Sequence, residues 1–287
     1  MFALMFIKDL YRNFLVKLQQ IYSLSEATTI SDWVFEKMVS LKKTDILKNP
    51  GKIITPAADE LMQQTLQQLM QHKPVQYVLG EAWFYNMRVK VNEHVLIPRP
   101  ETEELVDQLI TDRKSKLTDP SILDIGTGSG CIPIAIKKNL PASIVIAVDI
   151  SEKALAVAIE NAVLHNAHIN FKQMDFLDER KWYTLPMFDI IISNPPYIPV
   201  NEKEKLDKNV TAYEPHIALF VPNKSPLIFY EKIAAFGETN LRPSGKIYLE
   251  THEDFAHEVA ALFRKNYQTV MIKKDMNGKE RMILITI

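Results

Sequence analysis

Residues 188–198 fix the end of a buried strand, and this constrains the fold more than any other stretch of the chain. The segment begins with an apolar, β-branched run at residues 190–192 that is too short for a helix and predicts a strand. The strand has to end at Asn194 because Pro195 and Pro196 follow, and proline lacks the N–H that a central strand needs. We therefore expect the Asn194 amide to face the space beyond a strand end, where open α/β sheets bind their ligands.

The residues that follow Asn194 restrict what this strand end can bind. Two prolines make the backbone rigid, and Tyr197 adds an aromatic ring close to the amide. An amide acceptor, a rigid backbone and an aromatic ring together suit the binding of a flat, weakly nucleophilic nitrogen. A proline-terminated strand with a packing tyrosine would carry the same residues.

A second strand runs directly into a glycine loop. Residues 122–125, apolar except for Asp124, predict a strand, Gly126, Gly128 and Gly130 follow, and a helical stripe begins at residue 132. Glycine lets the backbone turn tightly and approach a ligand, and the helix behind it presents free N–H groups to an anion. The spacing is Gly-x-Gly-x-Gly, which disfavours the Gly-x-Gly-x-x-Gly loop of a nicotinamide dehydrogenase.

Two further predicted strands also end in carboxylates. Residues 144–148 end in Asp149, which can accept both hydroxyls of a ribose from the tip of a strand next to the glycine loop. Residues 170–174 are followed by Asp175 and Phe176. Because strands alternate with helices after residue ~120, we expect a mostly parallel sheet with helices on both faces.

The chain before this region follows a different pattern. Apolar stripes at residues 6–22 and 26–41, and a capped helix start at Thr55-Pro56, predict a small helical bundle over residues 1–75. This bundle carries no chemical motif, so both a scaffold and a docking module fit it. Period-two patterning at residues 82–97 predicts a β-hairpin. We therefore divide the chain into the bundle, a hairpin linker at residues 76–98, and a third domain at residues 99–287.

Composition excludes several classes of protein. The 287 residues carry a net charge of -1, so there is no basic footprint for direct nucleic-acid binding. A single cysteine, Cys131, fits a reducing cytosol, and no apolar run approaches the ~20 residues of a membrane span. His252 and His257 are not at metal-binding spacing with any cysteine. We expect a cytoplasmic, monomeric protein with no membrane contact and no metal.

Four segments resemble motifs of a known family. The segment Asn-Pro-Pro-Tyr at residues 194–197 resembles the active-site motif of adenine-N6 DNA methyltransferases and glutamine-N5 protein methyltransferases. Residues 97–103, Gln76-Tyr77 with Gly80, and residues 213–219 are similar to the glutamine-N5 group. The chain as a whole resembles the release-factor glutamine methyltransferases, also called the HemK/PrmC-like family.

This resemblance implies a fold, a cofactor and a reaction. The fold is the α/β class I (Rossmann-like) methyltransferase sheet of seven strands, the last antiparallel, with a small N-terminal helical domain. The reaction transfers a methyl group from S-adenosyl-L-methionine to N5 of the glutamine in the Gly-Gly-Gln motif of class-1 peptide-chain release factors. The resemblance also allows a ribosomal-protein glutamine methyltransferase, an adenine-N6 DNA methyltransferase or a non-catalytic cofactor-binding partner.

The resemblance also assigns site residues. Those implied for the cofactor are Asp124, Gly126, Thr127, Gly128, Ser129, Gly130, Asp149, Asp175, Phe176 and Asn194, and those implied for catalysis are Asn194, Pro195, Pro196 and Tyr197. Asn194 and the Pro195 carbonyl would accept the two N–H bonds of the substrate amide. Asp175 or its backbone would face the adenine amino group and Phe176 would stack on the ring. The alternative is a strand-end turn with a core phenylalanine.

Two segments keep open roles. Arg99 and Glu101 could pair, line the site or form a solvated turn. The long polar connection at residues 198–226 is hypothesised to be a substrate-covering lid, because loops beyond ~15 residues are usually functional or disordered.

Overall fold

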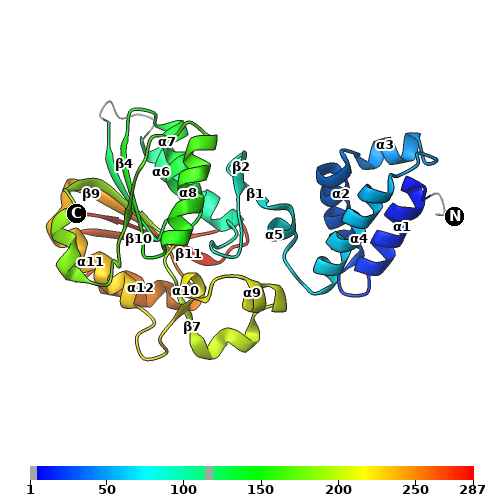
Figure 1. Cartoon of the computed structure of the whole chain (residues 1–287). Helices are drawn as coiled ribbons and strands as arrows, with labels where there is room; N and C mark the ends of the chain where they lie inside the picture. Colours follow the sequence, from blue (N-terminus) through cyan, green and yellow to red (C-terminus); the bar gives the residue numbers. More distant parts are fainter. Residues whose placement is uncertain (1–4, 114–118) are drawn as a thin grey trace. The chain divides into compact units, whose positions relative to one another are not determined.

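The computed structural model describes residues 5–113 and 119–287, which form two compact units (Figure 1). The smaller unit comprises the chain up to Gly80 together with Lys208–Tyr213. The larger unit comprises Glu81–Asp207 and Glu214–Ile287.

The smaller unit is helical, as the apolar stripes predict. Its helices are α1 (Ile7–Leu18), α2 (Leu24–Val39), α3 (Lys43–Lys48), α4 (Pro56–Met70), α5 (Val75–Leu79) and α9 (Lys208–Tyr213). Ser23 and Glu26 form a capping box at the start of α2, and Thr55 caps α4 through the Ala58 N–H. The sequence does not predict α3 and α5, because one or two turns are too short to show a periodic stripe.

Helix α9 joins the smaller unit from far along the chain. The Tyr213 hydroxyl donates a hydrogen bond of 2.7 Å to the Gln71 carbonyl, just after α4. The other short elements of the predicted long connection belong to the larger unit and are β7 (Ile198–Pro199), η2 (Val200–Lys205), α10 (His216–Leu219) and β8 (Phe220–Val221). Because β7 pairs with β8 in parallel, this segment is more ordered than a polar loop.

The larger unit begins with the predicted hairpin. Its strands are β1 (Glu81–Phe84) and β2 (Met87–Lys90), and they pair antiparallel. The turn residues Tyr85 and Asn86 have φ of 48° and 59°, the positive values that a tight hairpin turn of matching twist requires.

A seven-stranded sheet with the order β10-β11-β9-β6-β3-β4-β5 forms the centre of the larger unit. The strands are β3 (Ser121–Ile125), β4 (Ile144–Asp149), β5 (Asn170–Gln173), β6 (Phe188–Ser193), β9 (Leu241–Glu250), β10 (Thr269–Lys274) and β11 (Glu280–Thr286). Pairing from β9 to β5 is parallel, and β11 runs antiparallel to both of its neighbours. The expected class I methyltransferase sheet with an antiparallel last strand is confirmed.

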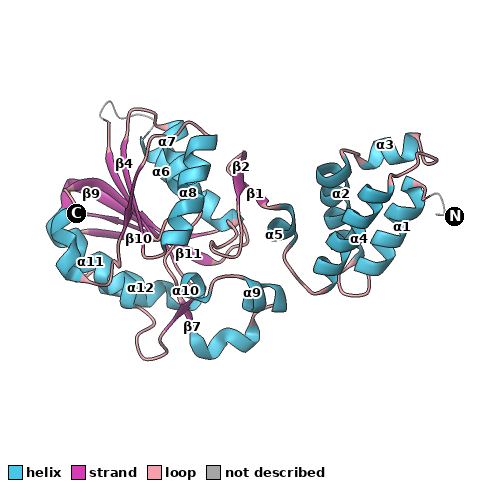
Figure 2. Cartoon of the chain, viewed as in Figure 1, coloured by secondary structure: helices cyan, strands magenta, loops and turns pink. Residues whose placement is uncertain are grey.

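Helices cover the sheet in two groups (Figure 2). The helices α6 (Pro100–Arg113), α7 (Cys131–Asn139) and α8 (Glu152–Leu164) pack one against the next. The helices α11 (Ile228–Asn240) and α12 (Ala256–Phe263) pack against each other over the opposite face. None of the helices in the described residues is long and apolar enough to cross a membrane.

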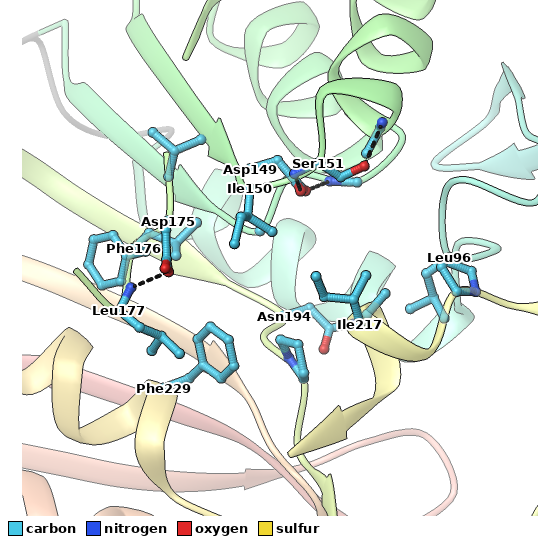
Figure 3. A pocket seen from close by; sticks show the side chains of 18 of the residues that line it. Leu96, Asp149, Ile150, Ser151, Asp175, Phe176, Leu177, Asn194, Ile217 and Phe229 are labelled. Atoms are coloured by element: carbon cyan, nitrogen blue, oxygen red, sulfur yellow. Dashed lines mark hydrogen bonds between the residues drawn. The ribbon is translucent and has the colours of Figure 1, made fainter. Parts of the chain in front are cut away.

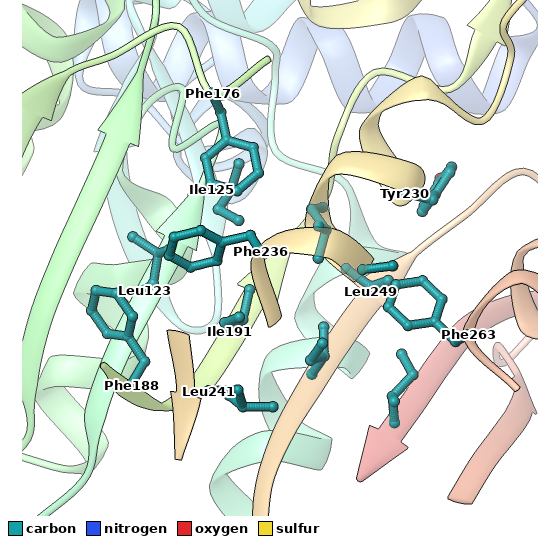
Figure 4. Packing of buried hydrophobic residues seen from close by; sticks show 14 of the residues in the cluster. Leu123, Ile125, Phe176, Phe188, Ile191, Tyr230, Phe236, Leu241, Leu249 and Phe263 are labelled. Atoms are coloured by element: carbon teal, nitrogen blue, oxygen red, sulfur yellow. The ribbon is translucent and has the colours of Figure 1, made fainter. Parts of the chain in front are cut away.

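The core under α11 and α12 is rich in aromatic side chains (Figure 4). Leu123 and Ile125 of β3 enter this core. Ile122 does not, because successive side chains of a strand point to opposite faces, and Ile122 shares its face with Asp124. Phe236 of α11 lies at its centre, with ring centroids 5.3 Å from both Phe176 and Trp182.

Asn161 of α8 fixes the hairpin and the glycine loop to this helix. It is fully buried, and its Oδ1 accepts from the Lys90 N–H at 2.7 Å. Its Nδ2 donates to the carbonyls of Lys90 and Ser129, each at 2.9 Å. One side chain therefore satisfies three backbone groups from two segments distant in sequence.

Replacing Asn161 with alanine should destabilise the larger unit by about 3 kcal/mol, at about 1 kcal/mol for each of the three hydrogen bonds. Equilibrium unfolding in urea measures this change. Asn139→Ala is the matched control, because Asn139 is exposed and makes a single bond to the Ala135 carbonyl. Equal stability of the two variants would contradict a holding role for Asn161.

Candidate active site

Three parallel strands end at one edge of the sheet. In the register of β3, β4 and β6, Ile125 pairs with both Val148 and Ser193. The Ser193 hydroxyl also donates to the Ile125 carbonyl at 2.7 Å. The chain continues from these strand ends into Gly126, Asp149 and Asn194, so the pairing brings together residues that are up to 68 positions apart.

A cavity of about 320 Å³ lies at this edge (Figure 3). Of the residues predicted for the site, those that line it are Gly126, Gly128, Asp149, Asp175, Phe176, Asn194 and Pro196. Those that do not line it are Asp124, Thr127, Ser129, Gly130, Pro195 and Tyr197. The cavity is also lined by apolar side chains, among them Leu96, Ile217, Phe220 and Phe229. Every lining residue belongs to the larger unit.

The three glycines of the loop have different local roles. All three have positive φ, between 54° and 77°, which other residues rarely adopt. A Cβ at Gly126 or Gly128 would meet no atom within 4 Å, so these two positions leave open space. A Cβ at Gly130 would lie 3.0 Å from the Ala158 Cβ, so Gly130 allows α7 to approach α8.

Asp149 links the end of β4 to the glycine loop. Its Oδ2 accepts from the Gly128 N–H and its Oδ1 from the Ser151 N–H, each at 2.9 Å. Burial raises the pKa of Asp149, and these backbone N–H groups act in the opposite direction. Each oxygen keeps a lone pair for a ligand hydroxyl, so Asp149 can orient the loop and bind a ribose at the same time.

Asp124 lies behind the loop and is fully buried. No donor among the described residues meets full hydrogen-bond geometry with either oxygen of its carboxylate, and the Thr127 hydroxyl, whose influence reaches Asp124, is likewise without such a bond. Burial raises the pKa of Asp124 to about 7, the Thr127 hydroxyl acts in the opposite direction, and the charge of Asp149 raises the pKa further. A buried polar group without a partner suggests a ligand or water that would satisfy it.

Asp175 and Phe176 combine the two interpretations that the sequence leaves open. The Asp175 Oδ1 accepts from the Leu177 N–H at 3.0 Å, which forms a strand-end turn. Phe176 is 4% exposed and belongs to the aromatic core, yet it also lines the cavity. Its position therefore allows packing on one side of the ring and ligand contact on the other.

Asn194 ends β6 at the cavity, and its amide group is held from behind. Its Nδ2 donates to the Thr102 hydroxyl at 3.0 Å, which leaves Oδ1 for the cavity. The Thr102 hydroxyl donates to Glu250 at 2.6 Å, and the Tyr197 hydroxyl donates to Glu250 at 3.2 Å. Tyr197 therefore points into a buried polar cluster and away from the cavity lining.

Arg99 pairs with Glu214, a residue of the family-like segment 213–219 to which the sequence analysis gave no role. Its guanidinium lies 2.5 Å from the Glu214 carboxylate, which also accepts from the Ile97 N–H at 3.0 Å. The Glu214 side chain is 1% exposed. This pair ties the start of residues 214–222 to the chain before α6. Because Ile217 and Phe220 of that segment line the cavity, the pair fixes one of its walls.

Comparison with known proteins identifies the family. Two family models match, the "PrmC N-terminal domain" at residues 9–80 and the "Methyltransferase small domain" at residues 102–212. The release factor glutamine methyltransferase of Flavobacterium psychrophilum is 40% identical over 98% of this chain and 99% of its own. The chain belongs to the release factor glutamine methyltransferase family.

Two further proteins are similar to this chain. The release factor glutamine methyltransferase of Bacteroides thetaiotaomicron is 38% identical over 93% of this chain and 95% of its own. A solved structure, the release factor-specific protein-(glutamine-N5) methyltransferase of Alicyclobacillus acidocaldarius, is 32% identical and aligns with a TM-score of 0.43 over 66% of this chain and 93% of its own.

Within this family member, the sequence analysis missed Thr102, Glu214 and Glu250. Thr102 lies inside residues 97–103, which the family resemblance had marked without assigning it a role. Glu250 follows the rule that selected Asp149, a carboxylate at the carboxyl end of a strand. Among the described residues, no group of three or more His, Cys, Asp or Glu side chains is arranged to hold a metal ion.

The buried carboxylate of Asp124 should make stability depend on pH. Because its pKa is raised in the folded protein, its contribution is present at low pH and is lost as pH rises through about 7. The loss is at most about 1.4 kcal/mol per pH unit. The stability advantage of Asp124→Asn over the wild type should therefore grow from pH 5 to pH 7 and then level off.

Urea unfolding at pH 5, 6, 7 and 8 measures this difference. Asp178→Asn is the control, because the hydrogen bond from Arg180 lowers the pKa of Asp178 and its titration lies below this range. Parallel stability curves for the wild type and Asp124→Asn would show that Asp124 does not titrate near neutral pH.

Proposed function

We propose that this chain transfers a methyl group from S-adenosylmethionine to N5 of the glutamine in the Gly-Gly-Gln motif of class-1 release factors. The observation that carries the proposal is the orientation of Asn194. Its Nδ2 is bound to Thr102, so its carbonyl oxygen is the atom available to a substrate in the cavity. A carbonyl oxygen accepts an N–H of a primary amide, and a glutamine side chain supplies that N–H.

The residues at the strand ends fit the cofactor. Gly126 and Gly128 leave open space in the loop, and Asp149 keeps acceptor capacity for ribose hydroxyls. Asp175 and Phe176 lie on the same cavity, where they would contact the adenine. When bound, S-adenosylmethionine supplies a methyl group made electrophilic by a positively charged sulfur.

The chemistry of an amide nitrogen determines what the protein has to contribute. The nitrogen lone pair is delocalised into the carbonyl, so the amide is a weak nucleophile and has to be held in line with the methyl group. Positioning of this kind can remove about 7–11 kcal/mol of the barrier. Asn194 Oδ1 and the Pro195 carbonyl would each accept one N–H of the substrate, which concentrates electron density on its nitrogen as the new bond forms.

The substrate assignment rests on the relatives, whose names identify release factors. The catalytic residues proposed here all lie in the larger unit, whereas the smaller unit carries apolar packing stripes and no lining residue. We therefore assign chemistry to residues 99–287 and recognition of the whole release factor to the helical domain at residues 1–75.

The test is incubation with purified release factor and labelled S-adenosylmethionine, followed by mass spectrometry of the methylated residue. A single methyl group on the Gly-Gly-Gln glutamine is expected. Parallel incubations with ribosomal proteins and with duplex DNA distinguish the other methyltransferases that share the Asn-Pro-Pro-Tyr motif. Methylation of either of these in preference to the release factor would overturn the substrate assignment.

Replacing Asn194 with alanine should reduce turnover by about 10²–10³, the usual cost of removing one preorganised polar group at a reacting centre. The fold and the cofactor affinity should stay unchanged, because the backbone path and Pro195 remain. Single-turnover methylation of the release factor measures the effect. Asn223→Ala is the control, since Asn223 is exposed, does not line the cavity, and accepts from the Asn201 N–H through its Oδ1. Near-normal turnover of Asn194→Ala would exclude this amide from the reaction.

Replacing Asp149 with alanine should weaken cofactor binding by about 10–150-fold, which corresponds to a charged hydrogen bond of about 1.5–3 kcal/mol. Part of this loss comes from the glycine loop, because Gly128 N–H loses its acceptor. Isothermal titration with S-adenosylmethionine provides the measurement. Asp107→Ala, which removes an exposed carboxylate bonded to Tyr85, should bind the cofactor like the wild type. Unchanged cofactor affinity of Asp149→Ala would show that Asp149 does not bind the cofactor and only holds the glycine loop.

A further inference from the structure

A buried chain of hydrogen bonds runs from Asn194 into the protein interior. Asn194 Nδ2 donates to Thr102 Oγ1 at 3.0 Å, and Thr102 Oγ1 donates to Glu250 Oε2 at 2.6 Å. Glu250 Oε1 accepts from the Tyr197 hydroxyl at 3.2 Å. Thr102 lies on α6 and is 3% exposed, and Glu250 lies at the end of β9 and is 1% exposed.

The direction of each hydrogen bond in this series follows from which of the groups carry protons. A threonine hydroxyl has one proton, and an ionised carboxylate has none. When Thr102 gives its proton to Glu250, its oxygen can only accept from Asn194. The asparagine must then turn its NH₂ group toward Thr102 and its oxygen toward the cavity.

We propose that Glu250, acting through Thr102, is a positioning residue that sets which end of the Asn194 amide faces the substrate. This inference rests on the proposed function, because it gives Asn194 the task of accepting an N–H from a glutamine amide. Neither Thr102 nor Glu250 lines the cavity, so each acts through Asn194 and not by contact with the substrate.

The two ends of an asparagine amide have nearly the same size and shape, so steric fit alone does not choose between them. A flipped Asn194 would present N–H groups to the N–H groups of the substrate, and the acceptor would be lost. The buried carboxylate removes this ambiguity, because a flipped amide would place its oxygen against a threonine oxygen whose proton is already used.

Protonation of Glu250 weakens this control. Burial raises the pKa of Glu250 to about 7, while hydrogen bonds from Thr102 and Tyr197 and the charge of Arg281 lower it, and Glu101 raises it. Tyr230 of α11 also faces this residue and donates to its backbone carbonyl at 3.0 Å. Protonated Glu250 can donate to Thr102, and the threonine proton is then free to bind a flipped Asn194.

The experiment measures kcat and KM for the release factor with Thr102→Val, Thr102→Ser, Glu250→Gln and the matched control Tyr230→Phe. Thr102→Val keeps the side-chain volume and removes the hydroxyl, so kcat should fall by about 10–100-fold, less than the loss of the amide itself. The cofactor dissociation constant should change less than twofold. Thr102→Ser restores the hydroxyl and should recover kcat to within about threefold of the wild type.

The control separates positioning from general stability. Tyr230→Phe removes a buried hydrogen bond to the same strand end, through the backbone carbonyl of Glu250 and not through its carboxylate. It should leave kcat close to that of the wild type. An equal loss of kcat in Tyr230→Phe and Thr102→Val, or no loss in Thr102→Val, would overturn the inference.

The dependence of kcat on pH provides a second test, which does not require Thr102→Val to fold. For the wild type, kcat should fall as pH drops through about 7, because Glu250 gains a proton there. Glu250→Gln cannot gain this proton, so its kcat should be lower at pH 8 and should lack this acid limb. An unchanged acid limb in Glu250→Gln would assign the limb to another group and overturn the role of Glu250.

A spectroscopic measurement tests the orientation without turnover. The side-chain NH₂ signal of Asn194 in ¹⁵N-labelled protein, assigned by its disappearance in Asn194→Ala, should shift in Thr102→Val and return in Thr102→Ser. No shift in Thr102→Val would contradict the inference. If the wild type methylates no glutamine, the proposed function fails, whereas the NH₂ signal still shows whether Thr102 and Glu250 hold the amide.

Discussion

The parallel pairing of β6 between β3 and β9 is the constraint on which the rest of the site depends. It sets Ser193 beside Ile125 on one side and beside Leu249 on the other. The glycine loop, Asn194 and Glu250 consequently emerge at the same edge, although they lie far apart in the sequence. A shift of one residue in this register would turn Asn194 to the opposite face of the sheet.

Local sequence rules predicted the parts of the molecule whose structure is determined locally. The diproline after Asn194 ends β6 because β6 is a central strand, and proline lacks the N–H that a central strand needs. The two left-handed residues Tyr85 and Asn86 form the turn of a hairpin that the pattern of residues 82–97 predicted. The number and direction of the strands followed from the family resemblance and the alternation of strands with helices. The sheet of the structure agrees with both.

Contacts between distant segments could not be predicted in the same way. Arg99 had acidic neighbours in the sequence, and only the folded chain places the buried Glu214 beside its guanidinium, 115 residues away. Thr102 and Glu250 are 148 residues apart, and neither has a local pattern that predicts their hydrogen bond. Phe176 shows a different difficulty, since one ring serves both the core and the cavity, and the sequence analysis treated these roles as alternatives.

Helix α9 affects how far the two units can be regarded as interchangeable modules. The chain leaves the larger unit after Asp207, contributes Lys208–Tyr213 to the smaller one, and returns at Glu214. A fragment cut at Gly80 would therefore lack one of its own helices, and the Gln71 carbonyl would lose the Tyr213 hydroxyl. Recombination between relatives that exchanged only the first 80 residues would separate this helix from its partner, so the two segments are expected to be inherited together.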